Sequence, residues 1–379
     1  MRNKQLKSLA TFVLSVAVLV GSTTAGYAHG TLDGTMHSML KVKTRPTATY
    51  VNGYSPEQLR TAYGVNAQSK RGAGETIAIV DAYGDSNIEN DLNVFDQRFG
   101  LSTPKSISVS YPQGKPTSND GGWALETALD VEWAHAMAPD ANLLVIAAKS
   151  ASTQDLLNAI QYANNHSAQV VSMSWGGNES RRESSLDSNF SHSGVVYLAS
   201  AGDDGAQSSW PATSSKVVAV GGTTLKLDSS NHRTSETAWN LSGGDISQYI
   251  NEPAWQASMR ISSNGMRGTP DVSFDADPNT GVAVYSSIDY NGSSGWSEVG
   301  GTSLSAPAWA GLIADGDNYS ALSGANQVLY KLAGGTSYTN PQNAFYDVVS
   351  GSNGNSASQG YDFVTGLGSP KADKLLPLL

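Results

Sequence analysis

Short apolar runs, rich in β-branched residues, recur along the chain from about residue 54 onward. Buried strands are expected at these runs, which span residues 76–80, 143–147, 169–173, 195–199 and 217–220. Helical patterns separate several of them, at residues 88–99, 123–137 and 153–164. Alternating buried strands and helices are typical of a parallel sheet that helices cover on both faces. The pattern therefore predicts an α/β fold, with a mostly parallel, twisted sheet in one domain over residues 51–379.

The first 50 residues have a different pattern. Basic residues at positions 2, 4 and 7 precede an apolar run over 9–20, and small residues then lead to Ala28. This is the pattern of a secretory signal peptide over residues 1–28, and the apolar run is too short to favour a permanent membrane span. Residues 29–50 are polar and aperiodic, and are expected to form a short N-terminal arm or leader. We therefore expect a secreted protein that is free of the membrane after cleavage.

Composition narrows the function classes. The chain has no cysteine, so disulfides cannot stabilise it outside the cell, and a core or a metal ion must do so. Charged residues make up 15% of the chain, against about 25% in typical proteins, and the net charge is −10. Sparse, net-negative charge argues against nucleic acids and anionic membranes as partners. Nothing in the sequence requires more than a monomer.

One serine has the setting of a nucleophile. Residues 301–307 read Gly-Thr-Ser-Leu-Ser-Ala-Pro and lead into a small, apolar run, so Ser303 lies where the chain turns into a buried helix. A serine hydroxyl needs a base to take its proton and donors to stabilise the oxyanion. The free N–H groups and partial positive charge of a helix start can supply the donors. The alternative is that Ser303 is a helix N-cap, a common role for serine.

The histidines are poor candidates for the base. His29 adjoins the signal cleavage site, while His166, His192 and His232 lie at a helix end or in polar turns. His135 is nine residues from Glu126, which places it about 180° away around a helix.

Glu126 and Asp130 offer another base. They are four residues apart and share one face of an otherwise apolar helix. Burial and like charge raise one pKa, so the pair shares a proton over an acidic range. A carboxylate in that state can accept a proton from serine in acid, where imidazole would be charged. The alternative is an ordinary, partly exposed acidic face. Asp203, in a Gly-Asp-Asp-Gly sequence, could donate to an oxyanion when protonated, or simply belong to a tight turn.

These elements together resemble the sedolisin, or serine-carboxyl peptidase, family, which is similar to subtilisin in fold but uses Glu in place of His. The similarity covers roughly residues 54–370. The matching motifs are Tyr54 to Arg60, Glu126-x-x-x-Asp130 followed by Ala138-Pro139, Ser174-Trp175-Gly176, Ser200-Ala201-Gly202-Asp203, and Gly301-Thr302-Ser303 with Ser305-Ala306-Pro307. Two departures are Gly300, where Ser is usual, and Asp245, where Gly is common.

The resemblance implies an endopeptidase that cleaves polypeptides at acidic pH. In that case Ser303 is the nucleophile, Glu126 the general base and Asp130 the group that orients it. Asp203 would be the oxyanion donor, and Trp175 and Gly176 would bind substrate. The resemblance also implies one structural calcium ion, with ligands Asp347, Asp362 and the backbone carbonyls of Val348, Ser358 and Gly360. Oxygen ligands on a glycine-rich loop suit calcium. Without the family, the segment 350–360 reads only as a polar loop.

Three other functions fit parts of the pattern. A Ser/His/Asp peptidase could use Asp81, after the first predicted strand, but it needs a histidine at a nearby helix start. A glycosidase could use Glu126 and Asp130 as paired carboxyls. Glycosidase carboxyls flank the substrate about 5 to 10 Å apart, whereas two carboxyls four residues apart on a helix usually lie closer and point the same way. A secreted binding protein of the same fold would have no need of all four of Ser303, Glu126, Asp130 and Asp203.

Overall fold

A computed structural model describes residues 34–49, 51–259, 261, 264–316, 324–335 and 338–379. The predicted signal peptide and His29 lie outside these residues. An eight-stranded sheet forms the centre, in the order β11-β10-β8-β6-β3-β5-β4 with β14 also paired to β10. Its strands are β3 (Thr76–Ala82), β4 (Ser106–Ser110), β5 (Asn142–Ala148), β6 (Val170–Met173), β8 (Val196–Ser200), β10 (Val217–Leu227), β11 (Arg233–Ala238) and β14 (Val272–Asp275). All these pairs are parallel except β10–β11, which confirms the predicted α/β fold.

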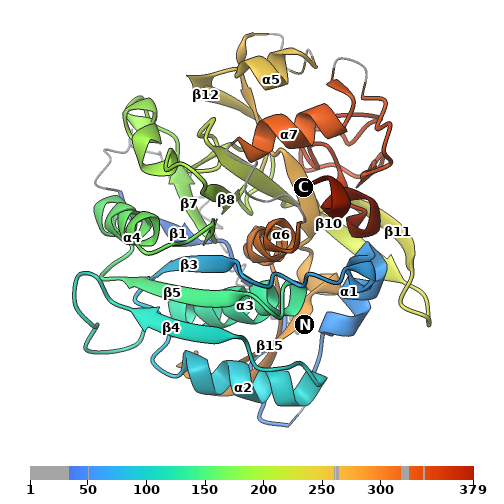
Figure 1. The fold of residues 1–379 in the computed structure, drawn as a ribbon. Coiled ribbons are helices and arrows are strands. Elements are labelled where there is room, and N and C mark those ends of the chain that lie inside the picture. Colours follow the sequence, from blue (N-terminus) through green and yellow to red (C-terminus); the bar gives the residue numbers. More distant parts are fainter. Residues whose placement is uncertain (1–33, 50, 260, 262–263, 317–323, 336–337) are drawn as a thin grey trace, which may run out of the picture.

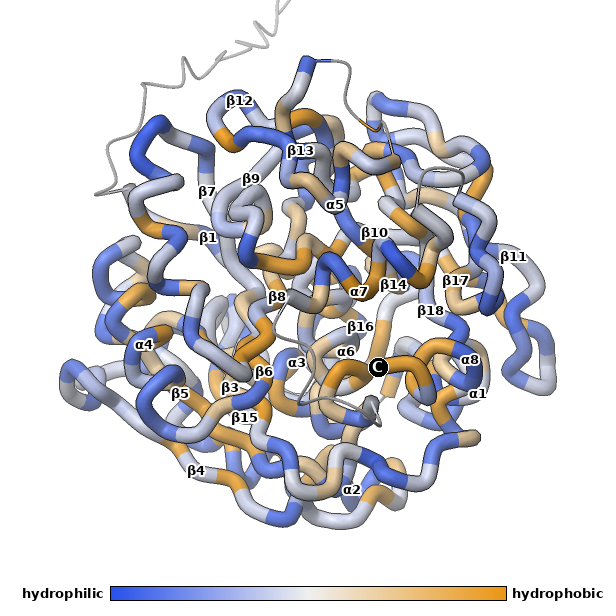
Figure 2. The backbone as a smooth tube through the Cα atoms, turned by 45° about the horizontal axis from the view of Figure 1, so that its top comes forward, coloured by the Kyte–Doolittle hydropathy of each residue, from blue (hydrophilic) through white to orange (hydrophobic). Residues whose placement is uncertain are grey.

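Helices cover both faces of the sheet (Figure 1). They include α2 (Ile88–Phe99), α3 (Gly121–Met137), α4 (Thr153–Asn165) and α6 (Thr302–Asp315). Because side chains alternate along a strand, Ile77 and Ile79 of β3 join the core under α3 and α6, while Ala78 and Val80 join the core under α4. Figure 2 shows hydrophobic segments at β6, β8 and α6 and hydrophilic loops around the rim. Burial on both faces explains why these strands read as continuous apolar runs.

The remaining elements surround this centre. Strands β15 (Val282–Tyr290) and β16 (Ser293–Gly300) form a hairpin that packs on α3. Smaller elements are α1 (Pro56–Tyr63), β9 (Ser209–Trp210), β12 (Ile246–Asn251), α5 (Ala254–Ala257), β13 (Met266–Gly268), α7 (Ala325–Leu332), β17 (Phe345–Tyr346), β18 (Ser369–Pro370) and α8 (Ala372–Leu375). Within the described residues, no helix combines the length and apolar character that a membrane crossing requires.

The part of the expected arm that the structure describes is paired with the body of the molecule. Strand β1 (His37–Ser38) pairs with β7 (Trp175–Asn178), and β2 (Lys41–Val42) pairs with β16. The pattern of apolar and polar residues contains no strand signal here, because the two strands are only two residues long and their partners are distant in the chain.

A glycine sets the register between the two central helices. An ideal Cβ on Gly311 of α6 would lie 2.5 Å from the Met137 Cβ and 2.9 Å from the Ala134 carbonyl oxygen of α3, so α6 approaches α3 too closely there for a side chain. Eight residues earlier on each helix, or about 12 Å away along parallel axes, are Ser303 and Glu126. Close packing at Gly311 therefore helps to bring these two residues together.

Candidate active site

Ser303 lies in the first turn of α6. The N-cap is Gly301, whose φ of 100° suits glycine, so Ser303 does not have the N-cap role considered as the alternative. The side chain is fully buried, and its hydroxyl donates to the Ser174 carbonyl oxygen at 3.3 Å. Ser303 thus lies at a helix start, and its hydroxyl is hydrogen-bonded to the backbone of Ser174.

Pro307 accounts for a second contact between these segments. It lies four residues after Ser303 inside α6, and it has no N–H to donate to the Ser303 carbonyl oxygen. The Ser174 hydroxyl donates to that oxygen at 3.2 Å instead. The Ser-Ala-Pro part of the motif therefore joins the start of α6 to the segment that precedes β7.

Three buried carboxyls gather beside Ser303. Glu126 and Asp130 lie on the face of α3 that is turned toward Ser303 and Ser174, and Asp81 lies near the end of β3. All three are fully buried. Their carboxyl oxygens have no hydrogen-bond partner among the described residues. Burial, and then the charge of Asp81, raise the pKa of Glu126 well above its usual range, while the nearby Ser303 and Ser38 hydroxyls lower it.

The same causes act on the other two carboxyls. Burial, followed by the charges of Asp81 and Glu126, raises the pKa of Asp130 well above its usual range, and the Ser174 hydroxyl lowers it. Burial raises the pKa of Asp81 to about 7, against a lowering effect of the Thr127 hydroxyl. The cluster of three carboxyls therefore shares and retains protons at pH values where isolated carboxyls are ionised.

Asp81 was not predicted as a member of this group. Its signal was present, because ligands of parallel sheets lie at the carboxyl ends of strands, but the sequence interpretation assigned it only to a Ser/His/Asp alternative. Histidine does not complete such a triad here. His135 contacts the Ser102 carbonyl oxygen at 2.9 Å and Asp96 at 3.3 Å, away from Glu126. The other predicted candidates that the structure describes are exposed: His166, His192 and His232.

Asp203 follows strand β8 and reaches the start of α6. Its Oδ1 accepts from the Thr302 N–H and hydroxyl, each at 2.8 Å, while its Oδ2 is buried without a hydrogen-bond partner. Burial raises the pKa of Asp203 to about 7, although the Thr302 hydrogen bonds and Lys41 lower it. An ideal Cβ on Gly301 would lie 2.7 Å from Oδ2, so this oxygen lies against the turn that precedes Ser303. A protonated Asp203 can therefore donate from Oδ2 at that turn.

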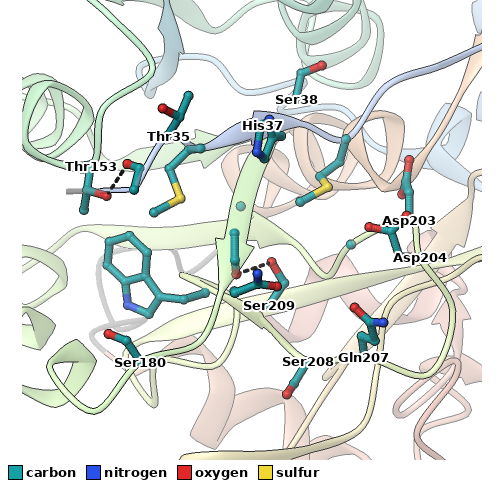
Figure 3. Close-up of a pocket in the computed structure, with 18 of the residues that line it drawn as sticks. Thr35, His37, Ser38, Thr153, Ser180, Asp203, Asp204, Gln207, Ser208 and Ser209 are labelled. Carbon is teal, nitrogen blue, oxygen red and sulfur yellow. Dashed lines mark hydrogen bonds between the residues drawn. The ribbon is translucent and has the colours of Figure 1, made fainter. Parts of the chain in front are cut away.

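A pocket of about 430 Å³ adjoins these groups (Figure 3). Strand β7 forms one wall with Gly176 and Gly177, and Asp203 lies at the rim. Trp175 is fully buried and donates from its indole N–H to the Val80 carbonyl oxygen at 2.8 Å, which fixes β7 to the central sheet. Gly176 and Gly177 carry no side chains, and the Met39 and Met36 side chains of the N-terminal arm lie close to where a Cβ on each of them would be. Of the two predicted substrate-side residues, Gly176 lines the pocket, whereas Trp175 is fully buried and does not line it.

The residues predicted to hold calcium are also close together. Both Asp347 oxygens accept from the Gly360 N–H, at 3.0 and 3.2 Å, and Asp362 accepts from the Ser358 N–H at 3.0 Å. Burial raises the pKa of both carboxyls, while hydrogen bonds from the loop lower it. One buried carboxylate, Asp362, and one partly exposed carboxylate, Asp347, on one polar loop are a donor set that fits a hard divalent cation. No group of three or more acidic or histidine side chains in the described residues is arranged to hold a metal, so a cation here would need backbone carbonyls as well.

Comparisons with known proteins agree with this arrangement. Residues 116–352 match the model of the subtilase family. Kumamolisin of Bacillus sp. (strain MN-32) is 33% identical over 89% of this chain and 65% of its own length. Sedolisin of Pseudomonas sp. (strain 101) is 28% identical over 89% of this chain and 64% of its own length. This chain therefore spans less than two thirds of these curated relatives.

One solved structure covers nearly the same extent as the described fold. Pseudomonas sedolisin, a serine-carboxyl proteinase complexed with two molecules of pseudo-iodotyrostatin, matches with a TM-score of 0.73 and 28% identity. The match covers 86% of this chain and 97% of that one.

Proposed function

Because this chain belongs to the subtilase family, in its sedolisin branch of serine-carboxyl peptidases, we propose that it is a secreted endopeptidase that hydrolyses peptide bonds in proteins at acidic pH. One observation carries the proposal: Ser303, at the start of a helix, lies beside a cluster of three buried carboxyls, those of Glu126, Asp130 and Asp81. Export is inferred from the predicted signal peptide over residues 1–28. With Ser303 and peptidase relatives in place, the glycosidase alternative has no separate support.

The base in this proposal is Glu126. Ser303 Oγ attacks the substrate carbonyl carbon while its proton passes to Glu126, and Asp130 orients Glu126 and shares the proton. Glu126 then returns the proton to the departing amine, which leaves an ester on Ser303. Water then attacks that ester while Glu126 takes a proton from the water. Glu126 passes this proton to Ser303 Oγ as the acid product leaves. Glu126 must be ionised to accept the Ser303 proton, and the proton that this buried cluster retains would then lie on Asp130 or Asp81.

The oxyanion has two donors. The Ser303 N–H is one, as expected at a helix start, and protonated Asp203 is the other. Asp203 donates only while it is protonated, and its pKa is raised to about 7 by burial. Ionised Asp203 would instead place a second negative charge beside the oxyanion. The proposed mechanism is therefore restricted to acidic and near-neutral solution.

Endopeptidase action is supported by the ends of the cleft. Residues 34–39 of the chain lie on one side of Ser303, and residues 41–42 lie on the other. Because residues 34–39 lie beside β7 as an extended chain, this part of the molecule accommodates more than three residues before the bond that reacts. We propose that the enzyme acts as a monomer on polypeptide substrates.

Hydrolysis of denatured casein from pH 2 to 8, with wild type beside Ser303→Ala, tests this function. We expect a bell confined to acid, with a decline as the pH rises through about 7, where Asp203 loses its proton. The Ser303→Ala variant should lose at least about 10³-fold in rate at every pH. Activity that rises toward alkaline pH, or that survives in Ser303→Ala, would contradict the carboxylate-driven serine mechanism.

We further propose one structural calcium ion on the loop that Asp347 and Asp362 contact. When bound, it would neutralise these two carboxylates and crosslink the C-terminal loop in a chain that has no cysteine. The carbonyls of Val348, Ser358 and Gly360 would complete the ligands.

Removal of this ion should lower thermal stability. A ligand at about 100 times its Kd stabilises a protein by about 2.7 kcal/mol, so chelation should lower the Tm by about 5 °C or more. Calorimetry with EDTA, then with calcium restored, measures this. Asp362→Asn should have a reduced Tm that no longer responds to calcium, whereas Asp373→Asn, at a half-exposed carboxyl in α8, should respond like wild type. Equal Tm values with EDTA and with calcium would rule out the site.

A further inference from the structure

The loop that carries Asp203 is hydrogen-bonded to a distant segment of the chain on both sides of that residue. This loop, residues 202–207, follows β8 and borders the pocket, where Figure 3 labels Asp203, Asp204 and Gln207. Its partner is the segment 241–244. Three backbone bonds join the two, from the Gly243 N–H to the Gly202 carbonyl oxygen (2.6 Å), from the Gly205 N–H to the Leu241 carbonyl oxygen (3.0 Å) and from the Gly244 N–H to the Gln207 carbonyl oxygen (2.9 Å).

The two segments pack backbone against backbone. An ideal Cβ on Gly243 would collide with the Ala201 carbonyl oxygen and would lie 2.8 Å from the Gly202 Cα. Only glycine fits at such a distance, so no side chain separates the segments. A shift of residues 241–244 is therefore passed directly to the loop that carries Asp203.

Asn353 contacts both segments at once. Its backbone carbonyl oxygen accepts from the Ala206 N–H at 3.0 Å, within the Asp203 loop. Its side-chain Nδ2 donates to the Ser242 carbonyl oxygen at 2.7 Å and to the Gly244 carbonyl oxygen at 3.4 Å, within the partner segment. The residue is 8% exposed, so these bonds are shielded from water. Asn353 therefore joins the loop to the segment on which it packs.

The orientation of the Asn353 amide is fixed by its own loop. Its Oδ1 accepts from the Asn355 N–H at 2.9 Å, and its backbone N–H donates to the Asn355 carbonyl oxygen at 3.1 Å. The Ser350 carbonyl oxygen accepts from the Ala238 N–H at 2.8 Å, which ties the start of this loop to the end of β11. Because Oδ1 is turned toward an N–H group, Nδ2 is turned toward the two carbonyl oxygens.

The position of the loop matters for the oxyanion. Thr302 at the start of α6 holds Asp203 Oδ1, whereas Oδ2 is buried without a hydrogen-bond partner. With Oδ1 fixed on α6, the direction of Oδ2 depends on where the loop places the Asp203 backbone. A donor to a transition state must be held to within about 0.5 Å of its productive position. The contacts that fix the loop are therefore part of the oxyanion geometry.

From these contacts we propose that Asn353 is a positioning residue for the oxyanion donor: it fixes the loop 202–207 against the segment 241–244 and thereby sets the direction of Asp203 Oδ2. This inference rests on the peptidase function proposed above. Asn353 acts through the backbone of Ala206 and through residues 241–244. Its loss should therefore weaken transition-state stabilisation and leave substrate binding nearly unchanged.

A positioning role differs from a structural one in its dependence on Asp203. A purely structural contact would cost the same activity whether or not Asp203 is present. A contact that acts through Asp203 loses its effect once the carboxyl is gone. A double-mutant cycle between the two residues separates these cases.

The cycle uses the full chain as wild type, Asn353→Ala, Asp203→Ala and the double variant. Initial rates on denatured casein at pH 4, over a range of casein concentrations, give kcat and KM. We expect Asn353→Ala to lower kcat by about 10- to 10²-fold with KM within about twofold of wild type. In the Asp203→Ala background the same substitution should change kcat by less than about twofold.

Hydrogen exchange measures the loop without using activity. Amide exchange is followed by mass spectrometry in Ser303→Ala protein. Adding Asn353→Ala should speed exchange of residues 202–207 and 241–244 by at least about tenfold. Ser352→Ala is the matched control, because Ser352 is exposed and its hydroxyl accepts from the Gly354 N–H at 3.1 Å within its own loop. It should keep the kcat and the exchange rates of the protein without this substitution.

A milder variant keeps the test decisive if Asn353→Ala does not fold. The Asn355 Nδ2 donates to the Gly244 carbonyl oxygen at 3.3 Å, so Asn355→Ala removes one support of the same segment. We expect a loss of about fivefold in kcat, again only when Asp203 is present.

The opposite results overturn the inference in distinguishable ways. An equal loss of kcat in both backgrounds would show that Asn353 is only structural, and a loss confined to KM would show that it acts on substrate binding. Wild-type kcat in Asn353→Ala, or wild-type kcat in Asn355→Ala if that variant must be used, would refute the positioning role even if the loop exchanged faster. Absence of casein hydrolysis by wild type would refute the proposed function, and the inference with it.

Discussion

Glu126→Gln should abolish peptide hydrolysis while the protein stays folded. The amide has nearly the same shape as the carboxyl but cannot accept the Ser303 proton, so we expect a loss on the order of 10³- to 10⁴-fold in kcat. The fold should tolerate the change, because Glu126 is fully buried without a hydrogen-bond partner and burial already favours its neutral form. Initial rates on casein at pH 4, with a circular dichroism spectrum and a Tm, measure both parts.

Glu132→Gln is the matched control on the same helix. Glu132 is also fully buried in α3, and burial raises its pKa well above the usual range, but it accepts from the Tyr285 N–H at 3.1 Å in the β15 hairpin. Its variant should keep activity within about twofold of wild type. If Glu126→Gln retained activity, or if both variants lost it equally, Glu126 could not be the specific base.

Asp203 should control the alkaline limit of activity. Asp203→Ala removes the Oδ2 donor and should cost about 10²- to 10³-fold in kcat. Asp203→Asn keeps an oxygen for the Thr302 N–H and provides an N–H donor that does not titrate. Since the pKa of Asp203 is about 7, the rate of Asp203→Asn relative to wild type should rise about tenfold per pH unit above 7.

Asp204→Asn separates this effect from a general loss of negative charge. Asp204 is the exposed neighbour of Asp203, and its charge helps to raise the pKa of Asp203. Its variant should keep the wild-type rate at pH 4 and shift the alkaline limit only slightly. A parallel decline of Asp203→Asn and wild type above pH 7 would show that Asp203 does not set that limit.

The sequence predicted the centre of the fold well because its strands are buried on both faces. Continuous apolar runs marked β3, β5, β6, β8 and β10, and α2 was predicted with its observed bounds. It did not mark β4 or the β15–β16 hairpin, whose strands carry exposed or partly exposed positions. A half-exposed strand lacks the continuous apolar signal, so its existence depends on partners elsewhere in the chain.

For the candidate active site, the spacing of residues in the sequence predicted relative positions only for residues of the same helix. Four residues between Glu126 and Asp130 predicted a shared helix face, and nine residues predicted that His135 would face away, as it does. The Gly-Thr-Ser motif predicted that a helix begins near Ser303, and α6 begins at Thr302.

The sequence by itself determined the class of fold and the family, and it singled out one serine and two carboxyls as candidates for the reaction, because these depend on residue types and short spacings. Only the tertiary structure decided that Asp81 joins the buried carboxyls, that Gly311 packs α6 on α3, and that the arm carries Met39 to the Ser303 N–H. These are contacts between segments far apart in the chain. They form because burial and backbone pairing act through space, so no local pattern contains them.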